Sequence, residues 1–290
     1  MKNNINYHIG EFLFRFFRKH SASFLANIYK AGITGTAKDI HRARLDVKKI
    51  FAILDLLSIV RLKNEKEPGY DRLFKKLYTI SGKIREIQVN FLLLSKPEFT
   101  IYDMNPYKLN LLLQERERTG EFLKTIRKFD EKELAWVEKR IKKEVYKIKP
   151  VTLKKKTNHY IRAKTAVIIA LFEKENDEQN LHKVRQHLKE LSTVLSLVIN
   201  VKPSGKLEQT IAGLNKSEMM IGEWHDKVVM ADSLENFLNH VKNLDESQLA
   251  QVREFRQKIA EDNKIQVDIV INEVKRLIQA GFSDENLRVV

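Results

Sequence analysis

Apolar residues recur at spacings of three and four along almost the whole chain, which is the period of an amphipathic α-helix. Clusters of Gly and Pro interrupt this pattern, and no alternating apolar and polar run is bounded by turn signals on both sides. The pattern therefore predicts an all-α protein. The expected helices cover residues 5–30, 36–62, 69–95, 105–148, 153–174, 178–200, 206–241 and 246–280. We expect the long 105–148 and 206–280 segments to be broken helices or hairpins.

Two motifs recur along the chain at nearly the same offset, which indicates two copies of a helical unit. The motif HRARLDVK at 41–48 returns 141 positions later as HKVRQHLK at 182–189. The motif GKIREIQV at 82–89 returns 140 positions later as GEWHDKVV at 222–229. The matched residues are His41 with His182, Arg44 with Arg185, Lys48 with Lys189, Gly82 with Gly222, and Arg85 with His225.

The first copy of the His-x-x-Arg-x-x-x-Lys motif lies on one face of its expected helix. An α-helix turns about 100° per residue, so His41, Arg44 and Lys48 fall within about 60° of one another. The opposite face is apolar and would contact a core; its residues are Ala43, Val47, Ile50, Leu54 and Leu57. Thr36 to Asp39 has the spacing of a capping box at the start of this helix.

A basic face opposite an apolar face is typical of any solvated helix, but its repetition with the same residue types favours a ligand. A phosphate chain suits these residues. Arg forms paired hydrogen bonds to phosphate oxygens, Lys supplies a mobile charge, and His adds a donor whose charge switches near neutral pH.

Composition narrows the class of protein further. The formal net charge of +15 and the isoelectric point near 9.7 indicate a polyanionic partner. The chain has no Cys, which excludes disulfides, thiolate metal sites and cysteine nucleophiles and fits a reducing compartment. No apolar stretch reaches the roughly 20 residues of a membrane helix, and the N-terminus has no signal-peptide pattern. We therefore predict a cytoplasmic protein without a membrane partner.

The repeated His-x-x-Arg-x-x-x-Lys pattern, followed about forty residues later by a Gly-containing element, resembles the CHAD family, named for a conserved histidine α-helical domain. The similarity covers about residues 36–280 and is most specific in LHKVRQHLKEL at 181–191 and IGEWHDKVV at 221–229. It implies two pseudo-symmetric four-helix bundles that form one CHAD-type unit over 33–280. The corresponding division is a Phe-rich N-terminal helix at 1–32, a first bundle at 33–149 and a second bundle at 150–290.

The resemblance also implies a function. It describes a binding or targeting module that holds inorganic polyphosphate in a basic groove between the bundles, without catalysis, a metal or a cofactor. Association with polyphosphate granules would follow from such binding. The residues to which the resemblance assigns polyphosphate contacts are His41, Arg44, Lys48, Lys49, Arg85, His182, Arg185, Lys189 and His225. Loosely aligned further candidates are Arg116, Arg118, Arg162 and Lys164.

The second copy departs from the family pattern. Glu190 stands where the first copy has Lys49, and Ser192 occupies a position that is commonly Arg in the family. These departures predict a less basic groove on the second side and leave open whether the second motif retains polyphosphate affinity.

Other functions remain open at this stage. A basic helical protein suits DNA or RNA as well as polyphosphate. A phosphohydrolase acting on polyphosphate would need clustered carboxylates to hold Mg²⁺, and the sequence shows no acidic motif of that kind. A scaffold that binds a protein through the Phe-rich N-terminal helix is a further alternative. The sequence predicts no oligomeric state.

Overall fold

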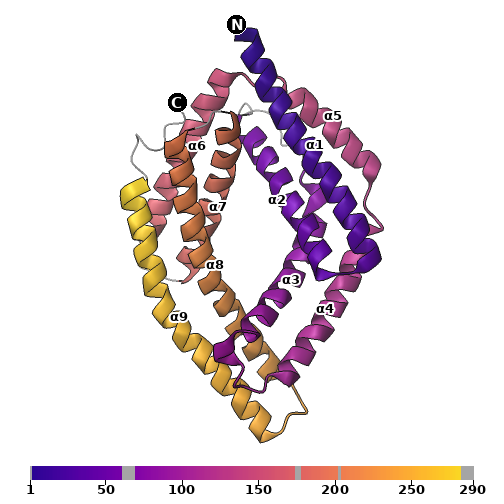
Figure 1. Ribbon diagram of the computed structural model, residues 1–290, viewed down its shortest axis with the longest axis vertical. Coiled ribbons are helices and arrows are strands. Elements are labelled where there is room, and N and C mark those ends of the chain that lie inside the picture. Colours follow the sequence, from indigo (N-terminus) through magenta and orange to yellow (C-terminus); the bar gives the residue numbers. More distant parts are fainter. Residues whose placement is uncertain (1, 61–68, 174–177, 202–203, 282–290) are drawn as a thin grey trace.

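The computed structural model describes residues 2–60, 69–173, 178–201 and 204–281, and the regular structure within these ranges is helical throughout (Figure 1). The predicted all-α class is confirmed for this part of the chain. Its elements are α1 (Lys2–Thr34), α2 (Ala37–Val60), α3 (Arg72–Leu94), the 3-10 turn η1 (Pro97–Phe99), α4 (Asn105–Ile126), α5 (Glu131–Val145), α6 (Pro150–Glu173), α7 (Glu178–Val201), α8 (Gly205–His240) and α9 (Glu246–Gly281). Residues 61, 62 and 174 of the expected helices, and 282–290 of the second predicted bundle, lie outside the described residues.

Both long segments are interrupted as expected. The 105–148 segment divides into α4 and α5 because Asp130 caps a new helix: its side chain accepts hydrogen bonds from the backbone N–H groups of Lys132 and Glu133 at 2.8 and 3.3 Å. Phe129 packs its ring 5.3 Å from that of Phe24 in α1, which holds the connection against α1. The 206–280 segment is the hairpin of α8 and α9.

The start of α2 only partly matches the predicted capping box. Thr36 accepts the backbone N–H of Asp39 at 3.4 Å, which is the expected half of the motif. The carboxylate of Asp39 does not reach back to the backbone N–H of Thr36 and instead accepts the hydroxyls of Thr34 and Thr36, both at 2.9 Å. The N–H of Thr36 donates to Thr34 Oγ1, because Gly35 turns the chain with a φ of 60°.

The helices form two sides that meet at both ends (Figure 1). Helices α1 to α5 make up one side and α6 to α9 the other. Within each side neighbouring helices pack closely, α1 on α2 and α8 on α9 most extensively. The two sides are joined where α2 packs on α6 and α7, and again where α3 and α4 pack on α8. Helices α2 and α7 thus belong to the interface between the repeats.

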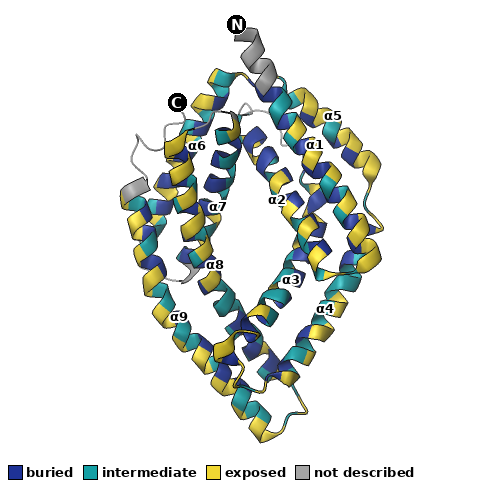
Figure 2. Ribbon diagram, viewed as in Figure 1, coloured by how far each residue is buried: buried dark blue, intermediate teal, exposed yellow. Residues whose placement is uncertain are grey.

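The buried residues lie mainly where neighbouring helices pack on one another (Figure 2). The larger core runs through both sides; it includes Phe17 and Phe24 of α1, Ile53 of α2 and Trp224 of α8. Each fully buried large side chain contributes roughly 1.5 to 3 kcal/mol. A smaller core joins the far ends of α3, α4, α8 and α9 around residues such as Phe255. The apolar face predicted for α2 does contact the core, with Ala43, Val47, Ile50 and Leu57 buried and Leu54 half-buried.

No helix among the described residues combines the length and hydropathy needed to cross a bilayer.

Candidate anion-binding site

In the first half of the molecule, the His-x-x-Arg-x-x-x-Lys motif on α2 faces the Gly-containing motif on α3, and the two helices run antiparallel. The guanidinium of Arg44 passes directly over Gly82, where a Cβ would lie 3.2 Å from Arg44 Nη1. Arg44 Nη1 donates to the backbone carbonyl of Tyr78 at 2.6 Å, and its Cζ lies 3.9 Å from the centre of the Tyr78 ring. Burial, together with the charge of Arg85 on α3, lowers the pKa of His41. The Nδ1 atom of His41 is buried without a hydrogen-bond partner among the described residues.

The second copy repeats this arrangement between α7 and α8. The guanidinium of Arg185 passes over Gly222 so closely that a Cβ there would lie 2.9 Å from Arg185 Nη2. The rings of His182 and His225 lie with their centroids 4.8 Å apart and their planes tilted by 31°. The Nε atom of Arg185 is buried without a hydrogen-bond partner among the described residues. The two motifs that recur in the sequence are therefore the two sides of one helix–helix contact in each half.

The contacts follow one register in each half. Because the two helices are antiparallel, a residue one turn further along one helix lies opposite a residue one turn earlier on the other. We call the two sets of facing residues the first row and the second row. The first row consists of His41, Arg44 and Lys48 on α2 against Arg85, Gly82 and Tyr78 on α3. The second row consists of His182, Arg185 and Lys189 on α7 against His225, Gly222 and Glu218 on α8.

The two rows meet at their lysines. Burial lowers the pKa of Lys48 to about 8, with further lowering by the charges of Lys189, Arg44 and Arg185, while Glu218 acts in the opposite direction. The pKa of Lys189 is lowered in the same way, first by burial and then by Arg185 and Arg44, again against Glu218. The pKa of each lysine is therefore lowered by the arginine of the other half. The interface between the repeats brings four cations into one partly desolvated cluster.

The histidine ends of the rows also lie close to charged groups of both halves. Burial, followed by His182 and Arg185, lowers the pKa of His225 to about 4, so this ring is neutral at pH 7. Burial raises the pKa of Asp226, while Arg185 and Arg85 act to lower it. Because Arg85 belongs to the first half and Asp226 to the second, the rows are neighbours here as well. The result is a region where positive charge outweighs negative charge at close range.

The crystal structure of the CHAD domain from the plant Ricinus communis matches this arrangement of helices with a TM-score of 0.67, covering 94% of this chain and 92% of that chain at 14% sequence identity. The chain has the CHAD-domain fold. The predicted resemblance is thereby confirmed at the level of the fold. No family model matches the sequence, and no curated protein matches it.

Several basic residues that the resemblance assigned to the groove of the CHAD fold lie apart from the two rows. Lys49 is exposed, and its charge acts on His20 of α1, which places it toward the α1–α2 contact. Arg116 and Arg162 are exposed on α4 and α6. Arg118 pairs with Glu121 at 3.3 Å and lines a cavity of about 250 Å³ between α3, α4 and α8.

Lys164 and Glu190 neutralise each other. Lys164 Nζ donates to Glu190 Oε2 at 2.5 Å and lies 3.2 Å from His187 Nδ1. Burial raises the pKa of Glu190, but the hydrogen bonds from Lys164 and Gln186 outweigh it and the net shift is downward. Glu190 is thus a carboxylate that is held by its own neighbours, although it replaces a lysine of the first copy.

Sequence reasoning missed Tyr78 and Glu218. Each stands four residues before the glycine of its row, so the offset of 140 that matched Gly82 with Gly222 also matches these two positions. Because a tyrosine and a glutamate differ in chemistry, this match does not by itself indicate a site, although both residues lie beside the central lysines or arginines.

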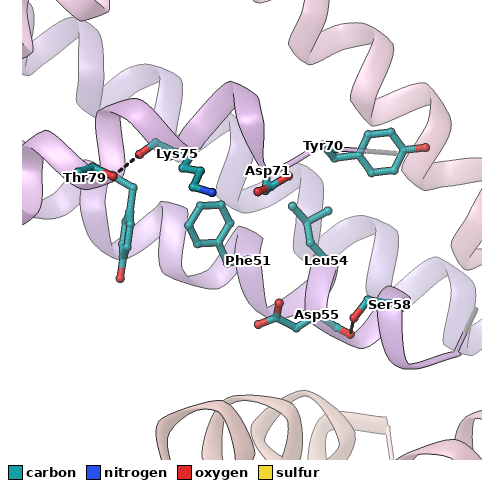
Figure 3. A pocket seen from close by; sticks show the side chains of 10 residues that line it. Phe51, Leu54, Asp55, Ser58, Tyr70, Asp71, Lys75 and Thr79 are labelled. Carbon is teal, nitrogen blue, oxygen red and sulfur yellow. Dashed lines mark hydrogen bonds between the residues drawn. The ribbon is translucent and has the colours of Figure 1, made fainter. Parts of the chain in front are cut away.

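A separate cavity of about 480 Å³ opens between the C-terminal half of α2 and the N-terminal part of α3 (Figure 3). Phe51 and Leu54 project into the space between the two helices, with Asp71 and Lys75 beside them, while Tyr70 points away and donates to Glu144 of α5 at 2.6 Å. The cavity shares Tyr78 with the first row, whose ring lies 5.2 Å from that of Phe51. None of the row cations lines it. Within the described ranges, no three His, Asp or Glu side chains gather as metal ligands.

Proposed function

We propose that this CHAD-fold chain binds inorganic polyphosphate between its two halves and acts as a non-catalytic binding module. The observation that carries the proposal is the meeting of the two rows at Lys48 and Lys189. The pKa of Lys48 falls to about 8 there because burial and neighbouring cations oppose its charge. A bound linear polyanion would offset both effects, because its negative charges compensate the buried and mutually repelling cations.

Burial and mutual repulsion make the cluster costly without a ligand and favourable with one. A charge-assisted hydrogen bond contributes about 1.5 to 3 kcal/mol, and the low local dielectric at a partly buried site strengthens it. Isolated surface cations are screened over roughly 8 to 10 Å in physiological salt. Four converging cations therefore support tight binding of consecutive phosphates in a way that the scattered surface lysines do not.

The test is calorimetric titration of long-chain polyphosphate into the protein at near-physiological salt, with single-stranded RNA of matched charge as the competing ligand. Removing both arginines in an Arg44→Ala, Arg185→Ala double variant should weaken polyphosphate binding by about 100-fold, since each loses at least one charge-assisted contact. The matched control is Lys139→Ala, Lys143→Ala, which removes the same charge from the exposed face of α5. Circular dichroism of both variants tests whether they keep their helices.

Unchanged polyphosphate binding in the arginine variant would contradict the site assignment. An equal loss in the lysine control would mean that net charge, and not the paired rows, drives binding. Release of orthophosphate from polyphosphate in the presence of Mg²⁺ would contradict the non-catalytic role.

Nucleic-acid binding is the second candidate, and one surface favours it. The α5–α6 corner carries a run of exposed basic side chains: Lys139, Arg140, Lys142, Lys143, Lys147, Lys149, Lys154 and Lys155. Such a patch attracts any polyanion through counterion release. Strong RNA binding that the Lys139 and Lys143 variant abolishes, with weak polyphosphate binding, would favour this alternative.

A further inference from the structure

The two rows differ at one position that the pseudo-symmetry would make equivalent. In the first row Tyr78 supports Arg44 with its ring and its backbone carbonyl. In the second row the same position is Glu218, which is half-buried on α8. An uncharged aromatic residue in one half therefore corresponds to a carboxylate in the other, at the point where the central lysines converge.

The register of α7 and α8 places Glu218 opposite Lys189. Arg185 packs over Gly222 on one side of this position, and Ser192 donates to Asn215 at 2.5 Å on the other. Between these two fixed contacts, one turn along α7 from Arg185 reaches Lys189, and one turn back along α8 from Gly222 reaches Glu218. The charge of Glu218 acts on Lys189 and also on Lys48 of the first half.

We propose that Glu218 is a built-in counter-ion that competes with bound polyphosphate for Lys48 and Lys189 and so sets the charge an anion needs to enter the site. This inference rests on the proposed function. A short anion contacts mainly the central lysines, so nearly all of its binding energy competes with Glu218. A long chain also contacts Arg44, Arg185 and the ends of the rows. Competition with Glu218 therefore removes a smaller fraction of its binding energy. Glu218 thereby makes the site selective for long, highly charged chains.

Glu190 shows that a carboxylate close to the central lysines in sequence does not necessarily compete with the anion for them. Glu190 follows Lys189 directly in sequence, but Lys164 and His187 hold it on another face of α7 at 2.5 and 3.4 Å. The charge of Glu190 is therefore compensated by these two neighbours. Glu218 instead acts on cations that belong to both repeats.

The experiment compares wild type, Glu218→Gln and the matched control Glu208→Gln, which removes an exposed carboxylate from the first turn of the same helix. Each is titrated calorimetrically with tripolyphosphate and with long-chain polyphosphate. In Glu218→Gln we expect tripolyphosphate to bind about tenfold more tightly and long chains about threefold more tightly, because one competing charge close to the site is gone. The preference for long chains should therefore fall about threefold, while the control behaves as wild type.

Two further readouts separate competition from a merely structural role. The salt dependence of long-chain binding should steepen by about 0.7, the slope expected for one additional phosphate neutralised. The pH profile should also shift. Lys48 faces Lys189, Arg44 and Arg185 as well as Glu218, and of these only Glu218 supports its protonation. Without Glu218, Lys48 loses its proton at lower pH, so binding should weaken at lower pH than in wild type.

Unchanged or weaker binding of both anions in Glu218→Gln, with long-chain binding intact in wild type, would overturn the counter-ion role and leave the proposed function standing. If wild type binds no polyphosphate, the proposed function fails. In that case binding that appears only in Glu218→Gln would still support the counter-ion, and its absence would overturn that as well.

Discussion

The two halves of the molecule hold their central arginines in the same way but surround them with different chemistry. In both, an arginine crosses a glycine of the next helix, and a His of one helix faces a basic residue of the other. In the first half Tyr78 stacks against Arg44. In the second half Glu218 takes that place, and Arg185 Nε is buried without a hydrogen-bond partner in the part of the chain that the structure describes. The geometry of the site is thus shared, whereas the charge around it is not.

The contacts outside the rows differ in the same manner. Asp46 on α2 accepts hydrogen bonds from Ser23 and Asn27 of α1 at 2.7 and 2.8 Å, and lies 3.1 Å from His20. The equivalent of Asp46 is His187, which contacts Lys164 of α6 across the same separation of 23 residues. The α1–α2 pair and the α6–α7 pair therefore correspond. Helix register is preserved between the repeats because backbone packing sets it, and polar side chains vary as long as each finds a partner.

The largest expected difference between the halves concerns stability. Asp46→Ala should lower the free energy of unfolding by about 3 kcal/mol, because it leaves the buried ring of His20 and the half-buried side chains of Ser23 and Asn27 without this acceptor. His187→Ala should lower it by less than about 1 kcal/mol, because Lys164 retains Glu190. Urea unfolding followed by circular dichroism at pH 7 measures both. Similar losses in the two variants would show that the two interfaces are energetically equivalent.

A second comparison replaces the glycines that the arginines cross. Gly222→Ala should weaken long-chain polyphosphate binding about fivefold, because its Cβ would lie 2.9 Å from Arg185 Nη2 and displace the guanidinium. Stability should be unchanged or higher, since Ala favours a helix by roughly 1 kcal/mol over Gly and the guanidinium is the free end of a flexible side chain. Gly82→Ala, with a wider 3.2 Å approach, should have a smaller effect.

Gly120→Ala on α4 serves as the control for this pair, because a Cβ there meets no atom within 4 Å. It should leave binding unchanged. If Gly222→Ala also binds normally, the close passage of Arg185 over Gly222 is not needed for the site.

A third comparison uses pH, because the second row has a histidine, His225, where the first row has an arginine. The pKa of His225 is about 4 in the folded protein, below the value near 6.5 of an exposed histidine. Between these two values the unfolded chain binds more protons, so the free energy of unfolding decreases as pH falls from 6.5 to 4. In His225→Gln this decrease should be shallower. Urea unfolding midpoints at pH 7 and pH 5 provide the measurement. An equal change in midpoint between these pH values in wild type and His225→Gln would contradict the burial of a neutral ring.

The smallest effect is expected at the residue that departs most visibly from the first repeat. Glu190→Gln should change polyphosphate affinity by less than about twofold, because Lys164 and His187 already neutralise this carboxylate. A gain as large as that expected for Glu218→Gln would mean that Glu190 also faces the anion. The same titration with Lys49→Ala, the counterpart of Glu190, tests whether the exposed lysine contributes to binding.

The sequence alone determined the helical class, the interruption of the two long segments, the two copies of the motif and the shared face of His41, Arg44 and Lys48. These features depend on the period of a single helix and on offsets along one chain. Only the tertiary structure showed why Gly82 and Gly222 accompany the arginines, that Tyr78 and Glu218 lie beside the central cations, and that Lys164 neutralises Glu190. It also separated Lys49 from Lys48, although the two are adjacent in the sequence. The physical reason is that a side chain's partner comes from a neighbouring helix, and the register between helices is decided by core packing, which the periodicity of either helix alone does not contain.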